Sequence, residues 1–160
     1  MLLHVMRHGP AEDRAPSGRD ADRSLTQAGR EVVARAARAL HEARSKAGRP
    51  PLRILASPFR RAHETAEIVA SAVVPAIEVD LHEDLGADAG LPLRLVAEVT
   101  AEGADVLLVG HQPVVEALVR HLVHPVEPPL PGGFRTALVV TLSPLAEGRW
   151  HLASVLDPYR

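Results

Sequence analysis

Leu2-Leu3-His4-Val5-Met6-Arg7-His8-Gly9 is an apolar run that stops abruptly at an arginine, a histidine and a glycine. The run Leu2–Met6 predicts a buried β-strand, whose end would place Arg7 and His8 at the edge of a sheet, where ligands bind in open α/β folds. Gly9 would let the chain turn sharply and approach a ligand without a clashing Cβ atom. The His8 imidazole is a candidate nucleophile, and Arg7 a candidate phosphate ligand. The alternative is that His8 only ends the strand and hydrogen-bonds a neighbour.

Strands and helices alternate along the rest of the chain. Apolar runs predict further strands at residues 52–56, 77–81, 105–109, 137–142 and 150–155, the last two paired as a hairpin across 145–148. Helical spacing and end signals predict helices between Thr26 and Gly48, between Pro58 and Pro75, from Pro92 to about Thr100, and from about Val114 to Val123. Residues 9–22, 86–90 and the proline-rich 125–133 are expected to be loops. This order is typical of an α/β fold with a mainly parallel sheet and an antiparallel part at its end.

Composition narrows the class of protein. The chain has 160 residues, of which 46% are hydrophobic but only 2% aromatic, so one domain over residues 1–160 would have a core of Ala, Val and Leu. A net charge of −2 argues against a nucleic-acid or membrane partner. The absence of cysteine excludes disulfides, thiolate metal sites and cysteine-phosphatase chemistry. There is no apolar run of about 18 residues and no cationic leader, so we expect a cytoplasmic protein.

Polar side chains follow three of the predicted strands. They are Arg7 and His8 after the first, Ser57 with Arg60 and Arg61 after the second, and His111 after the strand 105–109. Because the carboxyl ends of parallel strands lie at one edge of a sheet, these groups are expected to converge on one pocket. Two arginines and two histidines in one pocket make an anion site, and phosphate is the obvious ligand.

The same residues resemble the motifs of the histidine phosphatase superfamily, once named after phosphoglycerate mutase. The resembling segments are Arg7-His8-Gly9, Leu25-Thr26-x-x-Gly29, Ser57-Pro58-x-x-Arg61-Ala62-x-x-Thr65-Ala66 and Val109-Gly110-His111, in the family order. The short chain and Arg7-His8-Gly9-Pro10-Ala11-Glu12 are most similar to SixA-type phosphohistidine phosphatases. The resemblance implies a phosphoglycerate mutase-like fold, a three-layer α/β/α sandwich around a central, mostly parallel sheet.

The resemblance also implies roles for single residues. His8 would take the phosphoryl group on a ring nitrogen, while Arg7, Arg61 and His111 would hold the phosphoryl oxygens, His111 as an imidazolium. Fixed cations suit this work because the phosphoryl group in transfer spreads negative charge over its oxygens. We therefore expect no metal and no cofactor. Gly9 and Ser57 are further candidates for phosphate contact, with Ser57 alternatively an N-cap of the helix that follows it.

Other polar residues have weaker claims. Glu83 stands where relatives acting on alkyl phosphates often have a general acid, but SixA-type enzymes are thought to work without one, so we expect Glu83 at the pocket rim. Arg60 and the arginines of the first loop, Arg14, Arg19 and Arg23, are expected to be solvated. His4 is expected in the core. A helix pair of His121 and His124 is weak evidence for a metal site.

The function that these observations favour is metal-independent dephosphorylation through a phosphohistidine on His8. The expected substrate is phosphohistidine on a protein, such as a histidine phosphotransfer domain. A first alternative is a phosphatase of small phosphorylated metabolites that uses Glu83 as acid. A second is a non-catalytic module that binds phospho groups, against which the nucleophile His8 argues.

Overall fold

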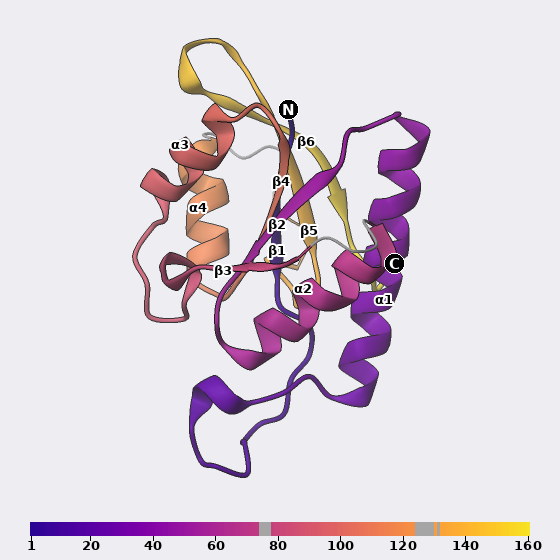
Figure 1. Cartoon of the computed structure of the whole chain (residues 1–160), viewed down its shortest axis with the longest axis vertical. Coiled ribbons are helices and arrows are strands. Elements are labelled where there is room, and N and C mark those ends of the chain that lie inside the picture. Colours follow the sequence, from indigo (N-terminus) through magenta and orange to yellow (C-terminus); the bar gives the residue numbers. More distant parts are fainter. Residues whose placement is uncertain (74–77, 124–129, 131) are drawn as a thin grey trace.

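One six-stranded sheet organises the part of the chain that the structure, a computed structural model, describes: residues 1–73, 78–123, 130 and 132–160 (Figure 1). In spatial order the strands are β3 (Asp80–Leu81), β2 (Leu52–Ala56), β4 (Asp105–Gly110), β1 (Leu3–Arg7), β5 (Val139–Pro144) and β6 (Trp150–Leu156). The first four run parallel, β5 is antiparallel to β1, and β6 is antiparallel to β5. The predicted parallel sheet with an antiparallel end is therefore confirmed.

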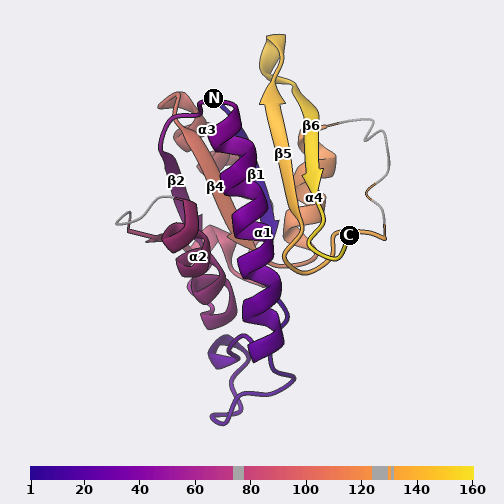
Figure 2. The ribbon, with the colours of Figure 1, turned by 90° about the vertical axis from the view of Figure 1, so that its right-hand side faces the viewer.

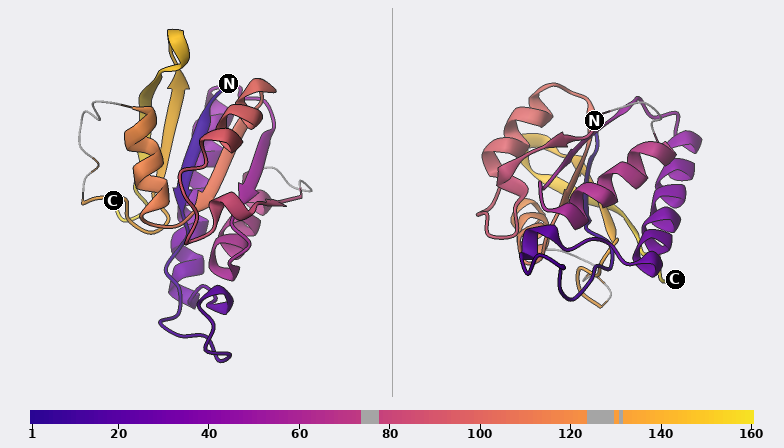
Figure 3. Two further views of the ribbon diagram at one scale, coloured as in Figure 1. Left: turned by 90° about the vertical axis from the view of Figure 1, so that its left-hand side faces the viewer. Right: turned by 60° about the horizontal axis from the view of Figure 1, so that its bottom comes forward.

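Helices cover both faces of this sheet and make three layers (Figures 2 and 3). The helices α1 (Gln27–Lys46) and α2 (Arg60–Val73) pack on one face, and α3 (Leu93–Ala101) and α4 (Val114–Leu122) on the other. Alternation along β1 supplies both cores, since Met6 faces α1 and α2 while Val5 faces α3 and α4. The predicted α/β/α sandwich is confirmed.

Glycines let the first loop lie tightly against α1. The Thr26 hydroxyl accepts the Gly29 N–H at 2.9 Å and caps the helix as predicted. A Cβ atom on Gly29 would lie 2.0 Å from the Pro10 carbonyl oxygen, and one on Gly9 would lie 2.4 Å from Val33 Cγ2. The Cβ position of Gly9 therefore faces helix α1, and the approach of Gly9 to a ligand stays a prediction.

Two predicted strands start later than their apolar runs. Ala137 has φ of 59°, in the left-handed region, and its N–H bonds to the carbonyls of Arg7 and His8, so regular pairing begins only at Val139. Strand β3 has two residues instead of the predicted 77–81, because it pairs with β2 alone at the sheet edge and its Leu81 is 47% exposed. Residue 77 and most of the predicted proline-rich loop lie outside the described residues.

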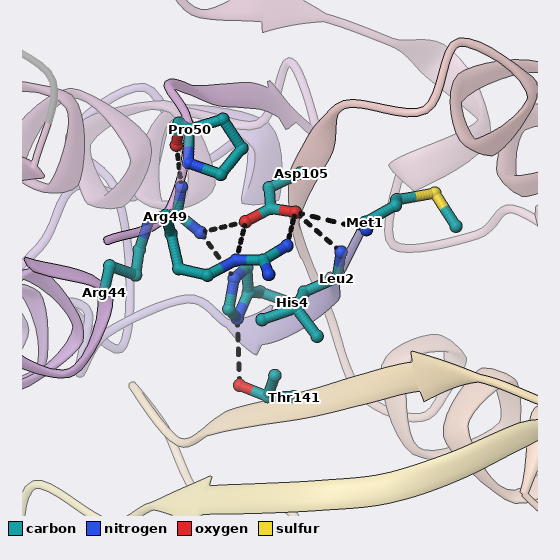
Figure 4. A network of polar contacts seen from close by, with 8 residues as sticks. All are labelled: Met1, Leu2, His4, Arg44, Arg49, Pro50, Asp105 and Thr141. Atoms are coloured by element: carbon teal, nitrogen blue, oxygen red, sulfur yellow. Dashed lines mark hydrogen bonds and ion pairs between the residues drawn. The ribbon is translucent and has the colours of Figure 1, made fainter. Parts of the chain in front are cut away.

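A buried carboxylate ties together the amino ends of β1 and β4 (Figure 4). Asp105 Oδ2 accepts Arg44 at 2.8 Å, and its Oδ1 accepts Arg49 at 2.6 Å and the Leu2 backbone N–H at 2.7 Å. Arg44 also donates to His4 Nε2 at 3.0 Å. His4 lies in the core, as predicted, at the end of the sheet opposite to His8.

The sequence predicts no membrane-spanning segment, and the helices of the structure can be compared with that prediction. In residues 1–73, 78–123, 130 and 132–160, no helix is both long enough and apolar enough to cross a membrane.

Candidate active site

The predicted site residues meet at the carboxyl edge of the sheet, which we define as the edge where β1, β2 and β4 end. Backbone hydrogen bonds continue one residue beyond these strands, from the His8 N–H to the Gly110 carbonyl and from the Ser57 N–H to the Val109 carbonyl, each at 3.0 Å. This pairing brings His8, Ser57 and His111 together. The predicted convergence of three strand ends is therefore confirmed.

The His8 ring is held in one tautomer by its two nitrogen partners. Its Nδ1 lies 2.7 Å from the Gly9 carbonyl oxygen, which can only accept, so Nδ1 carries the hydrogen. Its Nε2 lies 3.2 Å from Arg61 Nε, which can only donate, so Nε2 presents a lone pair. Both contacts select the same neutral imidazole, and the nitrogen free for chemistry is Nε2.

Electrostatics keep His8 neutral as well. Burial is the main cause that lowers the pKa of His8 to about 4; the hydrogen bond to the Gly9 carbonyl opposes it, and the positive charges of Arg61, Arg7 and Arg23 act in the same direction as burial. A histidine with a pKa of about 4 is unprotonated at neutral pH, so its Nε2 lone pair is available as a nucleophile.

Arg61 is buried in the first turn of α2 and is clamped by the loop after β1. Its terminal nitrogens donate to the Asp20 carbonyl oxygen at 2.8 Å and to Asp20 Oδ2 at 3.0 Å. Asp20 Oδ1 in turn accepts Arg23 at 2.8 Å. The expectation that Arg23 is solvated is therefore wrong, because it belongs to this clamp, whereas Arg14 and Arg19 are exposed as expected.

His111 faces His8 and is almost fully buried. The two ring centroids are 5.0 Å apart, and the Phe59 ring packs edge-on against His111 at 5.1 Å. Burial is the largest cause that lowers the pKa of His111 to about 3. The interactions with His8, Arg61 and Arg7 act in the same direction, and Asp20 opposes them. A desolvated ring beside cations stays neutral. The imidazolium expected when His111 holds a phosphoryl group stays a prediction.

Two buried nitrogen atoms at this edge have no hydrogen-bond partner among the described residues. Arg7 Nε and His111 Nδ1 are each buried without a hydrogen bond, although Arg7 also donates from a terminal nitrogen to the Phe134 carbonyl at 3.1 Å. Buried polar atoms are normally hydrogen-bonded. These two unpaired nitrogens beside the nucleophile are therefore candidate groups for binding an anion.

Comparison with known proteins places the chain in a family. The family model described as the histidine phosphatase superfamily (branch 1) matches residues 3–102. The chain belongs to this superfamily. An uncharacterized protein of Picosynechococcus is 38% identical over 118 residues, which are 71% of this chain and 67% of the relative. The predicted family is thereby confirmed.

Solved structures of the histidine phosphatase superfamily agree with this placement. The protein histidine phosphatase SixA, solved with tungstate, is 27% identical with a TM-score of 0.84, covering 99% of this chain and 98% of its own. A mycobacterial glucosyl-3-phosphoglycerate phosphatase, solved with VO3, is 22% identical with a TM-score of 0.70, covering 96% and 97%. The second likeness shows the fold alone. The chain is a SixA-like phosphatase of phosphoglycerate mutase-like fold.

Ser57 in this histidine phosphatase has a different local role from the predicted N-cap. Helix α2 begins at Arg60, and the Ser57 hydroxyl accepts the Phe59 N–H at 3.2 Å, before the helix starts. The same hydroxyl lies 2.8 Å from His111 Nε2. The N-cap expectation is therefore wrong, and Ser57 orients His111 by a direct hydrogen bond.

Glu83 lies outside this cluster. It begins a short 3₁₀ helix, η2 (Glu83–Leu85), after β3, and its exposed carboxylate forms no hydrogen bond or ion pair with any described residue. Arg60 is exposed as expected, in an ion pair with Glu64 at 2.9 Å. The structure therefore brings together Arg7, His8, Arg61, His111 and Ser57, and leaves Glu83 and Arg60 at the surface.

Asp20 and Phe59 are the site neighbours that sequence reasoning missed. The signal for Asp20 was a carboxylate within an arginine-rich loop, and the signal for Phe59 was an aromatic residue in a chain with few of them. For metals, the described residues hold no group of three or more His, Asp or Glu side chains that could bind an ion. His124, one half of the weak metal pair, lies outside the described residues.

Proposed function

We propose that this phosphatase works through a phosphohistidine on His8 Nε2 and that its substrate is phosphohistidine on a protein. The observation that carries the mechanism is the tautomer of His8. A neutral ring whose Nδ1–H is bound by a carbonyl and whose Nε2 faces an arginine is prepared to attack phosphorus.

In the first step, the Nε2 lone pair forms a bond to phosphorus while the bond from phosphorus to the leaving group breaks. The leaving group keeps that electron pair: an imidazole that is protonated on its other ring nitrogen leaves as a neutral molecule, whereas an alkoxide needs a proton. Arg61 Nε–H has to leave Nε2 for this attack, and a phosphoryl oxygen replaces the ring as its acceptor. Arg61 thus covers the nucleophile until the phosphoryl group takes the place of the ring as its acceptor.

In the second step, water attacks the phosphorus of phospho-His8. The N–P bond breaks, Nε2 recovers its lone pair, and the water loses a proton as inorganic phosphate forms. Arg7 and His111 supply donors to the phosphoryl oxygens in both steps, and the unpaired Arg7 Nε and His111 Nδ1 support this role. A phosphoryl dianion beside His111 raises the pKa of its ring and favours the imidazolium form.

The substrate proposal has two supports. One is the likeness to the protein histidine phosphatase SixA, which extends over nearly the whole of both chains. The other is the exposed and isolated Glu83, because an imidazole leaving group departs without the proton that an alkoxide needs. A phosphatase of alkyl phosphate metabolites would need a general acid from elsewhere.

The test compares substrates under identical conditions. A phosphorylated histidine phosphotransfer domain, phenyl phosphate and a panel of sugar and amino acid phosphates are given to the wild type and to His8→Ala. The proposal expects the highest kcat/KM for the phosphohistidine protein, with activity lost in His8→Ala. A sugar or other metabolite phosphate with a higher kcat/KM would establish the small-molecule alternative. Stoichiometric binding without turnover of any substrate would establish the non-catalytic alternative.

A further inference from the structure

A cavity of about 370 Å³ opens beside the proposed phosphoryl site, and Arg7 is one of its walls. Its other lining residues are Arg135, Thr136 and Tyr159, which come from the segment before β5 and from the C-terminal tail. None of these three residues takes part in the mechanism proposed above.

The antiparallel end of the sheet explains why the tail lies here. Strand β6 pairs with β5 so that its last residue, Leu156, is opposite Val139, the first residue of β5. Residues 157–160 therefore continue to the carboxyl edge, and the C-terminus lies near the start of β5 (Figures 2 and 3). The Ala137 N–H bonds to the carbonyls of Arg7 and His8, which joins residues 134–138 directly to the nucleophile strand.

The cavity is rich in positive charge and hydrogen-bond donors. The Tyr159 and Thr136 hydroxyls are 2.7 Å apart. Arg135, which is 42% exposed, shares the Asp157 carboxylate with Arg160, at 3.7 Å and 3.4 Å. One carboxylate thus faces two guanidinium groups here, and Arg7 adds a third.

The acidic groups that the structure describes near this cavity are already engaged. Burial lowers the pKa of Arg7, and the charge of Glu116 partly offsets this; Glu116 accepts hydrogen bonds from Gln112 and Arg120. Asp157 is the other, held between its two arginines. Among the described residues, a positive excess therefore remains beside Arg7.

We propose that Arg135, Thr136 and Tyr159 form a second anion subsite, which binds a negatively charged group on the leaving-group side of the substrate. This inference rests on the proposed function for the position of the leaving group. The preferred substrate then carries a carboxylate or a second phosphate next to the scissile bond. An acidic side chain beside a phosphohistidine and the acid group of a small phosphorylated metabolite offer the same chemistry.

Binding of inert phosphonates tests the subsite without requiring turnover. Calorimetry would compare phenylphosphonate with 4-carboxyphenylphosphonate for the wild type, Arg135→Gln and Tyr159→Phe. In the wild type we expect the carboxylate to tighten Kd by about fivefold, a typical effect of one partly exposed ion pair. In Arg135→Gln this preference falls to about one, and in 0.5 M salt the wild type loses most of it.

The matched control is Arg94→Gln, which removes an arginine that is 91% exposed on α3. This variant is expected to keep the wild-type preference for the carboxylate. Equal Kd values for the two phosphonates in the wild type, or a preference that survives Arg135→Gln, would overturn the subsite. Its failure is separable from that of the proposed function, since a carboxylate preference in an enzyme that hydrolyses no phosphorylated substrate would reject only the proposed function.

Two further arms identify the source of the anion. Phosphohistidine peptides with Glu or Gln beside the phosphohistidine are compared with phosphorylated small acids of matched charge. A Glu preference that Arg135→Gln abolishes assigns the subsite to a protein substrate. A preference confined to the small acids assigns it to a metabolite.

Discussion

Arg61 donates its Nε–H to the unprotonated Nε2 of His8 across 3.2 Å, although 53 positions separate the two residues in the chain. The contact requires a neutral ring, and the arginine charge helps to keep the ring neutral by lowering its pKa. The same donor is positioned for a phosphoryl oxygen. One hydrogen bond thus links the protonation state of the nucleophile to the recognition of the substrate.

Removal of the nucleophile is expected to abolish turnover. His8→Ala should lower kcat by at least about 10³-fold on every substrate, because no other side chain at this edge can form the covalent intermediate. Steady-state assays of the purified variant measure the loss, and circular dichroism with thermal unfolding confirms that the variant folds. Retention of a tenth of wild-type kcat by a folded variant would show that His8 is not the nucleophile.

Loss of the Asp20 charge is expected to weaken the site through Arg61. Asp20→Asn should lower kcat/KM by about three- to tenfold, the effect of a partly exposed ion pair that positions a catalytic group. Asp22→Asn is the matched control, since Asp22 lies in the same 3₁₀ helix and pairs with Arg19 and Ser17 instead. An unchanged kcat/KM in Asp20→Asn would mean that Arg61 needs no clamp.

Glu83→Gln is expected to change turnover of phosphohistidine and of alkyl phosphates by less than about tenfold each, under about 1.4 kcal/mol. The reason is that its carboxylate is exposed and makes no contact with the described site residues. Rates on both substrate types, measured side by side, decide the matter. A loss of about 10²–10⁴-fold confined to alkyl phosphates would identify Glu83 as the general acid after all.

Activity is expected to survive a chelator. The positive charges that face the phosphoryl group in the proposed mechanism belong to Arg7 and Arg61, which no chelator removes. Hydrolysis of phenyl phosphate should be the same within experimental error before and after dialysis against EDTA. Activity that disappears with EDTA and returns with Mg²⁺ or Zn²⁺ would contradict this mechanism.

Protein stability is expected to fall in mild acid, partly through His4. Burial is the largest cause that lowers the pKa of His4 to about 4. The charges of Arg44 and Arg49 act in the same direction, and Asp105 opposes them. The unfolded chain therefore takes up this proton first, near pH 6.5, so the free energy of unfolding decreases as the pH falls from about 6.5 to about 4. Such a group contributes a slope of up to about 1.4 kcal/mol per pH unit.

Urea unfolding at several pH values between 4.5 and 7.5 measures that slope. His4→Gln should reduce the slope by up to the amount that one proton contributes. His41→Gln, at an exposed position of α1, should leave the slope unchanged. The slope is the relevant quantity, because His4→Gln also disturbs the hydrogen bonds to Arg44 and Thr141 and lowers stability at every pH. An identical slope in His4→Gln and the wild type would show that the pKa of His4 is not lowered in the folded protein.

Much of the site could be predicted because its information is local. An apolar strand that ends at Arg7-His8 has to expose these side chains at the sheet edge, whatever the rest of the chain does. The rule that parallel strands share one carboxyl edge then joins them to Ser57 and His111. The Thr26 cap is local in the same way, since a hydroxyl and an N–H three residues away form it.

The features that the sequence did not indicate are those that the path of a loop or the burial of a group decides. The neutral His111 depends on how many atoms cover its ring, and the clamp of Arg23 and Asp20 on Arg61 depends on where the first loop returns to α2. Neither quantity has a signature in residue spacing.

The sequence by itself therefore determined the α/β order, the family and the chemical groups that one edge of the sheet would collect. Only the tertiary structure decided which nitrogen of His8 is free, which charges are neutralised and that Tyr159 at the far end of the chain lies beside Arg7. The physical reason is range. Strand and helix patterns act over a few residues, whereas desolvation, ion pairing and strand pairing depend on contacts between residues that are far apart in the chain.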